Sequence, residues 1–335
     1  MSITAKELAK KLGLSETAVS MALNNKPGVS TNTRKRVIEA AEQAGYDFER
    51  INAKSQKKGS IYFISYRSSN VILSYNPIFD ELWEGLVNAC QKRNYPVRML
   101  QVYEKLDNLD LIFEEIRGSD CVGIILVGTE MKPDKLRAFM SLGMPITLLD
   151  SQSREYPCNS VLINNFQGAY IATNYLIAQY RETPGYLQSA YTIANFEERT
   201  RGFHKALNDN GMSRSHAITH QLAPSIEYAM ADMLEVIDSG EKLARCYYSD
   251  NDAIAIGAIK ALKLRGYRIP EDVAVMGFDN ISEARIIEPA LTTMDVPRYF
   301  IGSVAADNLI GQIENKYHHV VNVEILPTLT RRFST

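Results

Sequence analysis

The sequence lacks the features that mark several large classes of protein. Its four cysteines are scattered without a CxxC pair, which excludes a disulfide framework and the usual spacing of zinc ligands; they are Cys90, Cys121, Cys158 and Cys246. No apolar run approaches the ~20 residues that span a bilayer, and the polar N-terminus has no signal-like stretch. We therefore expect a protein of the reducing cytoplasm without a membrane partner.

The motifs of common catalytic sites are also missing. The sequence has no GxxxxGKS/T, GxGxxG, HExxH or GxSxG pattern, so no phosphate loop, dinucleotide fingerprint, metalloprotease helix or nucleophile elbow is recognisable. The histidines lie in polar contexts that indicate no metal site; they are His204, His216, His220, His318 and His319. We expect no enzyme, no cofactor and no metal ion. An α/β enzyme stays as an alternative that turnover of a sugar would support.

Charge is distributed unevenly along the chain. The net charge is −2, but residues 1–58 carry 11 basic and 6 acidic side chains, whereas the remainder carries 26 and 33. A small basic segment on an acidic body is typical of a polyanion-binding module. The length of 335 residues and the 45% of apolar residues favour two or three compact units with sizeable cores.

The N-terminal segment predicts three short helices. Thr4-Ala5-Lys6-Glu7 fits a capping box at the start of the first helix, and Gly13 ends it. Ser15 is a candidate N-cap of the second helix, and the third begins near Ser30 and ends at Gly45. Apolar residues at helical spacing are predicted to face inward: Ala5, Leu8, Ala9, Leu12, Val19, Ala22, Leu23, Val37, Ala40, Ala41 and Ala44.

Two helices separated by Gly13-Leu14-Ser15 make a helix-turn-helix. If the apolar side chains of the second helix point inward, its polar face points outward and can enter a DNA major groove; this face consists of Glu16, Thr17, Ser20 and Met21. An ordinary three-helix bundle with a solvated face has the same spacing, so both interpretations stay open at this point.

From residue 60 onward, apolar strands alternate with amphipathic helices, after a polar linker at 49–60. This alternation predicts an α/β fold with parallel sheets. The strands are expected at 61–65, 97–101, 122–127, 146–149, 161–163, 185–188, 245–248 and 273–278. The segment exceeds one flavodoxin-sized unit, so we expect two lobes with a ligand cleft at the carboxyl ends of the strands.

Polar residues follow several of these strands. Asp150, Asn251 and Asp279 each come directly or almost directly after a strand, and Arg199 is predicted to open a helix. Carboxylates, a carboxamide and a guanidinium in one cleft suit a ligand with many hydroxyls. The alternative for each residue alone is a helix N-cap, and Asp252 is expected to cap the helix that follows it.

Several sequence blocks occur in an order that is typical of one family. They are LSETAVSMALN at 14–24, NNFQGAYIATNYLI at 164–177, RTRGF at 199–203, YSDNDAIAIGA at 248–258 and VAVMGFDNISEARIIEPALTTMDVP at 273–297. Through them essentially the whole chain resembles the LacI/GalR family of bacterial transcription regulators. The resemblance implies a headpiece at 1–48, a hinge at 49–59 and a two-lobed, periplasmic-binding-protein-like effector and dimerisation domain at 60–335.

The resemblance also implies lobe boundaries and site residues. One lobe would comprise about 60–160 and 294–320, and the other about 161–293 and 321–335. The implied ligand-binding residues are Phe79, Asp150, Arg199, Asn251 and Asp279, and the implied DNA-binding residues are Ser15, Glu16, Thr17, Ser20, Met21 and Asn24. Many relatives have Arg at the position of Met21, which reads guanine, whereas Met packs on a thymine methyl. In the hinge, Gln56 replaces an apolar wedge.

We therefore expect a sequence-specific repressor of the cytoplasm that binds double-stranded operator DNA as a homodimer. A small polar effector in the interlobe cleft, with a sugar as the leading candidate, would control its DNA affinity. A purine or another metabolite acting as corepressor is the alternative. A pure solute-binding protein would leave residues 1–58 without a purpose.

Overall fold

The structure is a computed structural model, which describes residues 3–23, 28–46, 58–68, 78–315 and 319–335. Contacts divide the chain into two units, Met1–Gly59 and Ser60–Thr335. The predicted hinge, with Gln56, lies almost wholly outside the described residues, as does Asn24. Within the described ranges, no helix is both long and apolar enough to cross a membrane.

The first unit contains the three predicted helices, α1 (Ala5–Leu12), α2 (Glu16–Leu23) and α3 (Thr31–Gln43). The capping box is confirmed, because the Thr4 hydroxyl accepts the N–H of Glu7 and the Glu7 carboxylate accepts the N–H of Thr4. Gly13 ends α1 with a left-handed φ of 66°, which a residue without Cβ adopts freely. The three helices share one small core, formed by Leu8, Ala9, Val19, Ala22, Val37 and Ala41.

The second unit contains two sheets of six strands, in the orders β11-β5-β4-β3-β1-β2 and β12-β10-β9-β8-β6-β7. All pairs are parallel except β10 with β12. The strands are β1 (Ser60–Arg67), β2 (Val97–Tyr103), β3 (Cys121–Val127), β4 (Ile146–Leu149), β5 (Asn159–Ile163), β6 (Gly185–Ser189), β7 (Thr219–Leu222), β8 (Cys246–Ser249), β9 (Ala274–Asp279), β10 (Thr292–Asp295), β11 (Asn322–Ile325) and β12 (Thr328–Thr330). The predicted α/β class with parallel sheets is confirmed.

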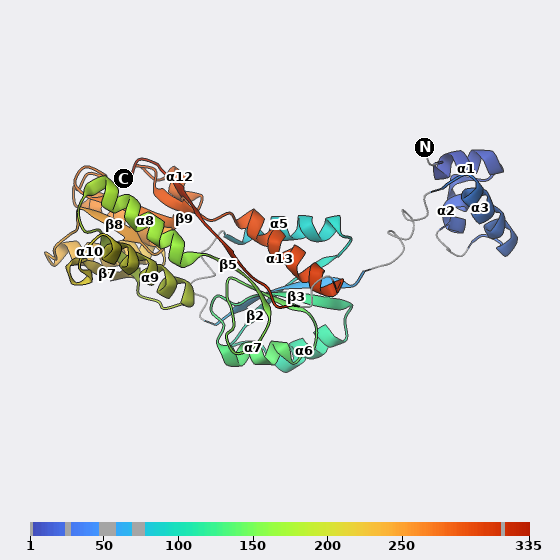
Figure 1. The fold of residues 1–335 in the computed structure, drawn as a ribbon, viewed down its shortest axis with the longest axis horizontal. Helices are drawn as coiled ribbons and strands as arrows, with labels where there is room; N and C mark the ends of the chain where they lie inside the picture. The colour runs from blue at the N-terminus through green and yellow to red at the C-terminus, as the bar shows by residue number, and fades with distance from the viewer. Residues whose placement is uncertain (1–2, 24–27, 47–57, 69–77, 316–318) are drawn as a thin grey trace. The chain divides into compact units, whose positions relative to one another are not determined.

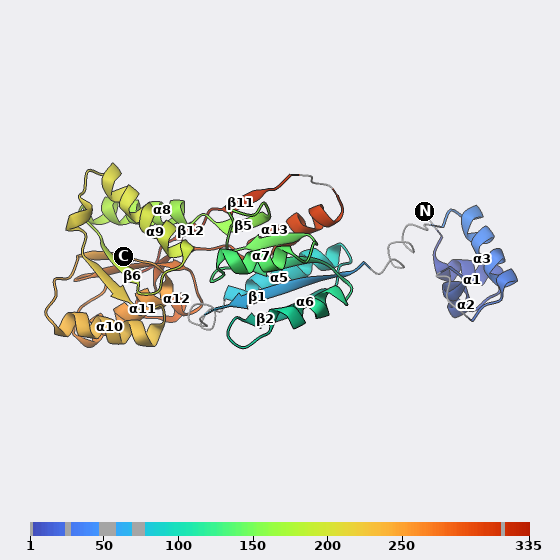
Figure 2. The ribbon, with the colours of Figure 1, turned by 90° about the horizontal axis from the view of Figure 1, so that it is seen from below.

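Helices cover both faces of each sheet, as Figure 1 shows for the first lobe and Figure 2 for the second. In the first lobe, Ile61 and Phe63 of β1 share a core with α5 and α13, whereas Tyr62 and Ile64 face α6 and α7. In the second lobe, α8 and α9 cover one face, and α10 and α11 the other. The bounds are α5 (Ile78–Lys92), α6 (Leu109–Arg117), α7 (Pro133–Met140), α8 (Asn165–Tyr180), α9 (Ala194–Asp209), the 3₁₀ turn η1 (Arg214–His216), α10 (Ile226–Asp238), α11 (Asp252–Leu264), α12 (Glu283–Ile286) and α13 (Arg298–Ile313).

The chain crosses between the lobes three times, after β5, after β10 and after β11 (Figure 2). The crossings therefore lie just beyond Ile163, Asp295 and Ile325, rather than at about 160, 293 and 320 as the sequence predicts. The reason is that β5 and β11 pair with each other in the first sheet as far as Ile163 and Ile325, and β10 pairs with β9 in the second sheet as far as Asp295. Both sheets end at these crossings, which places the carboxyl ends of their strands at the boundary between lobes.

Candidate functional site

In the N-terminal unit, α2 presents an exposed polar face. The Ser15 Oγ accepts the N–H of Ala18 at 3.1 Å, as an N-cap does. Glu16, Thr17 and Ser20 are exposed, while Val19 is fully buried on the opposite side. The exposed face of α2 is therefore the one that the sequence predicts, and its N-terminal end carries short hydrogen-bonding side chains.

Met21 differs from its neighbours because it is half-buried. Its Sδ lies 3.1 Å from the place where a Cβ at residue 28 would be, and Gly28 has a φ of 113°. A side chain at position 28 would therefore press on Met21 and strain the backbone. The glycine leaves Met21 room at the edge of the exposed face.

A cavity lies between the two lobes at the carboxyl ends of the strands. The empty space at this place, together with the open solvent that it adjoins, is about 760 Å³. Its walls are mostly apolar with a few polar groups, as in small-molecule sites. The lining residues are Leu82, Val127, Thr129, Leu149, Asp150, Val161, Ile163, Ile193, Asn195, Phe196, Arg199, Asn251, Asp279, Val296, Arg298 and Ile301. Four of the five predicted ligand residues line it, and the Phe79 side chain lies outside the described part of the chain.

Arg199 is held firmly in the second lobe and is only 3% exposed. Its Nε donates to Asn165 Oδ1 at 2.8 Å, one terminal nitrogen donates to the Asp250 carbonyl, and the other pairs with Asp279 Oδ1 at 3.2 Å. The central carbon of the guanidinium lies over the Phe278 ring, 3.7 Å from the ring centroid. A guanidinium has five N–H groups, so two remain for a ligand.

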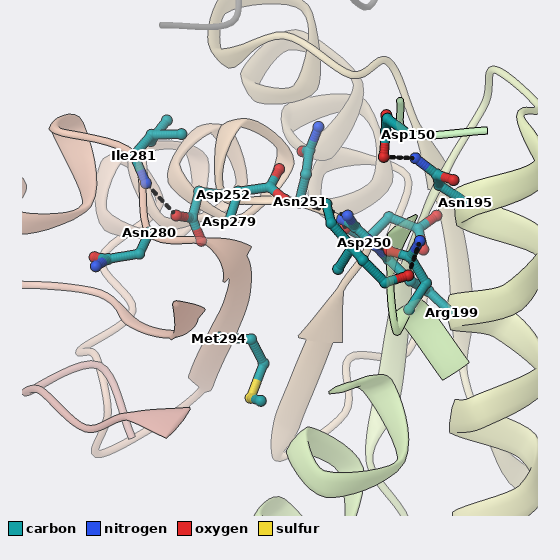
Figure 3. Close-up of polar contacts among 12 residues, drawn as sticks. Asp150, Asn195, Arg199, Asp250, Asn251, Asp252, Asp279, Asn280, Ile281 and Met294 are labelled. Atoms are coloured by element: carbon teal, nitrogen blue, oxygen red, sulfur yellow. Dashed lines mark hydrogen bonds and ion pairs between the residues drawn. The ribbon is translucent and has the colours of Figure 1, made fainter. Parts of the chain in front are cut away.

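Asp150 and Asn195 meet across the cavity, as Figure 3 shows. Asp150 follows β4 in the first lobe, and its Oδ1 accepts from the Asn195 amide of α9 in the second lobe at 2.9 Å. Its Oδ2 accepts from the Thr129 hydroxyl at 2.6 Å. Burial raises the pKa of Asp150, although both hydrogen bonds and Arg199 oppose the shift. Among the described residues, the hydrogen-bond partners of the carboxylate are thus neutral, and the carboxylate joins the lobes.

Asp279 ends β9 with an unusual backbone φ of 111°. This turn directs its carboxylate to Arg199 and its carbonyl to Arg298, which donates from Nη2. Burial raises the pKa of Asp279, while Arg199 and Arg298 act in the opposite direction. Asp279 therefore connects the arginine of the second lobe with the first residue of α13 in the first lobe.

Family models match both units of the chain. A model of the lacI family of bacterial regulatory proteins matches residues 4–47, and a model of a periplasmic binding protein-like domain matches residues 173–335. The chain belongs to the LacI family. It is a DNA-binding transcriptional regulator, as the sequence predicts.

Full-length relatives and solved structures agree with the LacI family assignment. The HTH-type transcriptional repressor PurR of Aliivibrio salmonicida (strain LFI1238) is 27% identical over 337 residues, covering 99% of this chain and 98% of the relative. The transcriptional regulator CelR in its cellobiose complex has a TM-score of 0.73 at 21% identity, covering 99% and 100%. The lac repressor dimer bound to operator and the anti-inducer ONPF has a TM-score of 0.73 at 20% identity, covering 100% and 99%. The structural likeness shows that the fold is shared.

Two further acids of this LacI-family chain lie behind the cavity wall and are fully buried. Asp250 accepts from the Ser189 N–H at 2.7 Å and from the Tyr186 hydroxyl, and burial raises its pKa to about 6. Asp252 accepts from the Ile281 N–H at 2.9 Å and from the Thr293 hydroxyl at 2.6 Å. Burial, and then the nearby Asp279, raise the pKa of Asp252 to about 8. The sequence pattern gave no reason to single out Asp250.

Two predictions about helix starts in this family member are wrong. Asn251, not Asp252, caps α11, because the Asn251 Oδ1 accepts the Ile254 N–H at 2.9 Å. Asp252 instead points inward over Gly277, where a Cβ would lie 2.0 Å from its carboxylate oxygen. Arg199 does not open a helix, since α9 begins at Ala194 and places Arg199 more than a turn further on.

Sequence reasoning missed three polar residues of the LacI-family cleft, namely Thr129, Asn195 and Arg298. Thr129 follows β3 as Asp150 follows β4, so the same strand-end rule identifies it. Asn195 and Arg298 stand instead at the starts of helices, where no strand-end signal exists. Among the described residues, no group of three or more histidines, cysteines or acids is placed to hold a metal ion.

Proposed function

We propose that this LacI-family chain is a cytoplasmic homodimeric repressor whose operator affinity depends on a small polar effector, with sugars as the leading class. The effector binds between the lobes to Asp150, Arg199, Asn251 and Asp279, with Asn195 as an additional contact. The observation that carries the proposal is the Asp150–Asn195 hydrogen bond, which joins the lobes at a cavity whose mostly apolar walls carry a few polar side chains. A ligand that satisfies both residues favours one relation between the lobes over another.

Hydroxyl-rich ligands fit the free hydrogen-bonding groups of the cleft. The Asn251 Oδ1 is used by its helix, but its Nδ2 has no protein partner among the described residues. Arg199 has two further N–H groups, and the Asp150 carboxylate accepts from ligand hydroxyls. The CelR structure contains cellobiose, which agrees with this class of ligand. Phe196 supplies an aromatic surface for a sugar ring.

On the DNA side, we propose that the residues 1–48 form the headpiece and that 49–59 is the hinge to an effector and dimerisation domain at 60–335. Two copies of α2 enter successive major grooves of a pseudo-palindromic operator. Glu16, Thr17 and Met21 read base edges, and Ser15, Ser20 and Asn24 contact the backbone. The effector binds two arrangements of the lobes with different affinity. This difference couples effector binding to DNA binding by about 1–3 kcal/mol, which changes the DNA affinity by roughly 5- to 150-fold.

A nucleobase corepressor is the second candidate effector. The full-length relative from Aliivibrio salmonicida is named a PurR repressor, and Phe196 with the Asn, Asp and Arg groups of the cavity also suits a planar heterocycle. Such an effector would strengthen operator binding rather than release it. The sign of the effect therefore separates the two candidates. No catalytic group is part of either proposal.

The first test is a selection of random duplex DNA with the full-length protein, followed by effector screening on the enriched sequence. We expect a pseudo-palindrome, and release or tightening by metabolites that depends on Asp150 and Arg199. The variant Thr17→Ala on the exposed face should change enrichment, whereas Lys10→Ala on the outer side of α1 serves as a control for general charge loss. Failure to enrich any motif, with and without added cell metabolites, would refute the proposal.

A further inference from the structure

Arg298 is a cation in the wall of the cavity that no role described so far explains. It is 5% exposed and is the first residue of the 16-residue helix α13, so its guanidinium stands at the N-terminal end of that helix. A helix N-terminus carries a partial positive charge and favours anions, not cations. The helix cap, Pro297, provides no side-chain hydrogen bond there. Two sources of positive potential therefore lie at one end of the cavity.

The hydrogen bonds of Arg298 leave part of its guanidinium unused. Its Nη2 donates to the Asp279 carbonyl, and its Nη1 donates to the Asn280 carbonyl at the long distance of 3.5 Å. Its Nε is buried and has no hydrogen-bond partner among the described residues. A buried donor without a partner costs about 1–3 kcal/mol. A group that accepts from Nε would remove this cost.

Among the described residues, Arg298 has no ion pair with a buried acid, although its charge opposes the rise that burial causes in the pKa of Asp279 and of Asp252. Within the described part of the chain, its one ion pair is with Glu81, at 3.7 Å, and the Glu81 side chain is 62% exposed. An exposed partner at that distance is screened by water. Asp279, a buried acid of the cavity wall, is paired with Arg199. At the other side of the cavity, Asp150 has neutral hydrogen-bond partners only.

We propose that the effector is an anionic sugar derivative whose acidic group binds Arg298 at the N-terminus of α13, while its hydroxyls bind Asp150, Asn195 and Asn251. The proposal rests on the function proposed above and narrows its class of ligand. A carboxylate or phosphate accepts from the Nε and a terminal nitrogen of Arg298 in the paired geometry that guanidinium groups favour. Helix N-termini bind both kinds of anion. Arg298, the first residue of α13 in the first lobe, donates to the Asp279 and Asn280 carbonyls of the second lobe, so the acidic group binds where the two lobes meet.

The test measures binding of matched sugars to the full-length protein by titration calorimetry. Each of glucose, galactose and mannose is compared with its uronic acid and its 6-phosphate. We expect at least one acid or phosphate to bind ten times more tightly than its neutral parent, or more. The arm that shows this difference tells whether a carboxylate or a phosphate is recognised.

Substitutions at Arg298 test whether this residue causes the preference for anionic sugars over their neutral parents. In Arg298→Gln the ratio of acid to neutral affinity should fall about tenfold or more, because the positive charge is lost while a polar side chain is kept. Arg298→Lys should retain part of the ratio. Because the ratio compares two ligands on one variant, general damage to the cleft does not change it. Arg201→Gln, at a residue whose side chain is 63% exposed on α9, is the matched control and should leave the ratio as it is.

Three outcomes would overturn the proposal: neutral parents that bind as tightly as the anions, a ratio that Arg298→Gln leaves unchanged, or no binding by any member of the panel. None of these three outcomes changes the result of the operator selection, because that selection is measured without these sugars. An enriched pseudo-palindrome together with any of these outcomes would leave the repressor function standing and remove only the anionic class of effector.

Discussion

Replacing Asp252 by asparagine should stabilise the protein at neutral pH. Asp252 is fully buried, its pKa is raised to about 8 by burial and by Asp279, and its two oxygens accept from Ile281 N–H and the Thr293 hydroxyl. The asparagine Oδ1 can keep the Ile281 bond, and its Nδ2 can donate to the Thr293 oxygen, which also acts as an acceptor. The variant therefore resembles the protonated acid of the wild type.

The expected magnitude follows from the difference between the folded and unfolded pKa. Because the folded value is raised, the folded protein binds a proton that the unfolded chain releases from about pH 4 upward. This bound proton contributes to the free energy of unfolding. Its contribution is complete below pH 4 and decreases as the pH rises toward 8. At pH 7 the loss amounts to about 4 kcal/mol for one carboxyl with these values. Asp252→Asn removes this dependence, so it should gain about 2–4 kcal/mol at pH 7 and nothing at pH 4.

Denaturant unfolding of both proteins between pH 4 and pH 8 measures the effect. The two curves of unfolding free energy against pH should converge in acid and separate toward neutral pH, with the variant above. Asp238→Asn is the control, because Asp238 is exposed and paired with Arg265, which lowers its pKa. That variant should gain no stability at neutral pH. Parallel curves for wild type and Asp252→Asn, or a variant less stable at pH 7, would refute the reasoning.

Three other substitutions test the reading of the two sites. Met21→Arg should change the preferred base at one operator position to guanine, with a discrimination of about 1–3 kcal/mol; an unchanged sequence preference in duplex selection contradicts it. Asn195→Ala removes the bond across the cavity and should weaken effector binding by about 1 kcal/mol, or roughly fivefold; an unchanged effector affinity in titration calorimetry contradicts it. Arg199→Met leaves Asp279 unpaired and should lower the free energy of unfolding by about 3–5 kcal/mol. Most of that loss should return in the double variant with Asp279→Asn, and equal losses in both variants would exclude the ion pair as the cause.

Much of the cleft could be predicted from sequence because parallel strands end at the same edge of a sheet. Asp150, Asn251 and Asp279 follow three such strands, so strand recognition alone brings them together. Asn195 and Arg298 escaped prediction because their place in the cleft depends on how one lobe faces the other. Periodicity along the chain carries no information about that relation.

The assignment of Asp252 shows a second limit of local patterns. Asn251 and Asp252 are both good N-cap residues, and either fits before α11. The structure decides by packing, because Gly277 on β9 leaves a space that only the second of the two side chains fills. The glycine that makes this space is far away in sequence, and nothing near residue 252 indicates it.

The backbone of the cleft also has positive φ angles at residues other than glycine, and two of these residues, Asp150 and Asp279, carry carboxylates that line the cavity. Among the described residues, non-glycine residues with positive φ include Asn94, Arg181 and Asn315 at helix ends, where such conformations are common. The others are Asp150, Asp279 and Asn280, which stand at the ends of β4 and β9. Glycine would relax these strand ends, but it has no carboxylate to hold Asn195 or Arg199. The backbone strain is therefore retained near the points where the Asp150 carboxylate and the Asp279 carbonyl join the lobes, as expected if the relation between the lobes is what the effector controls.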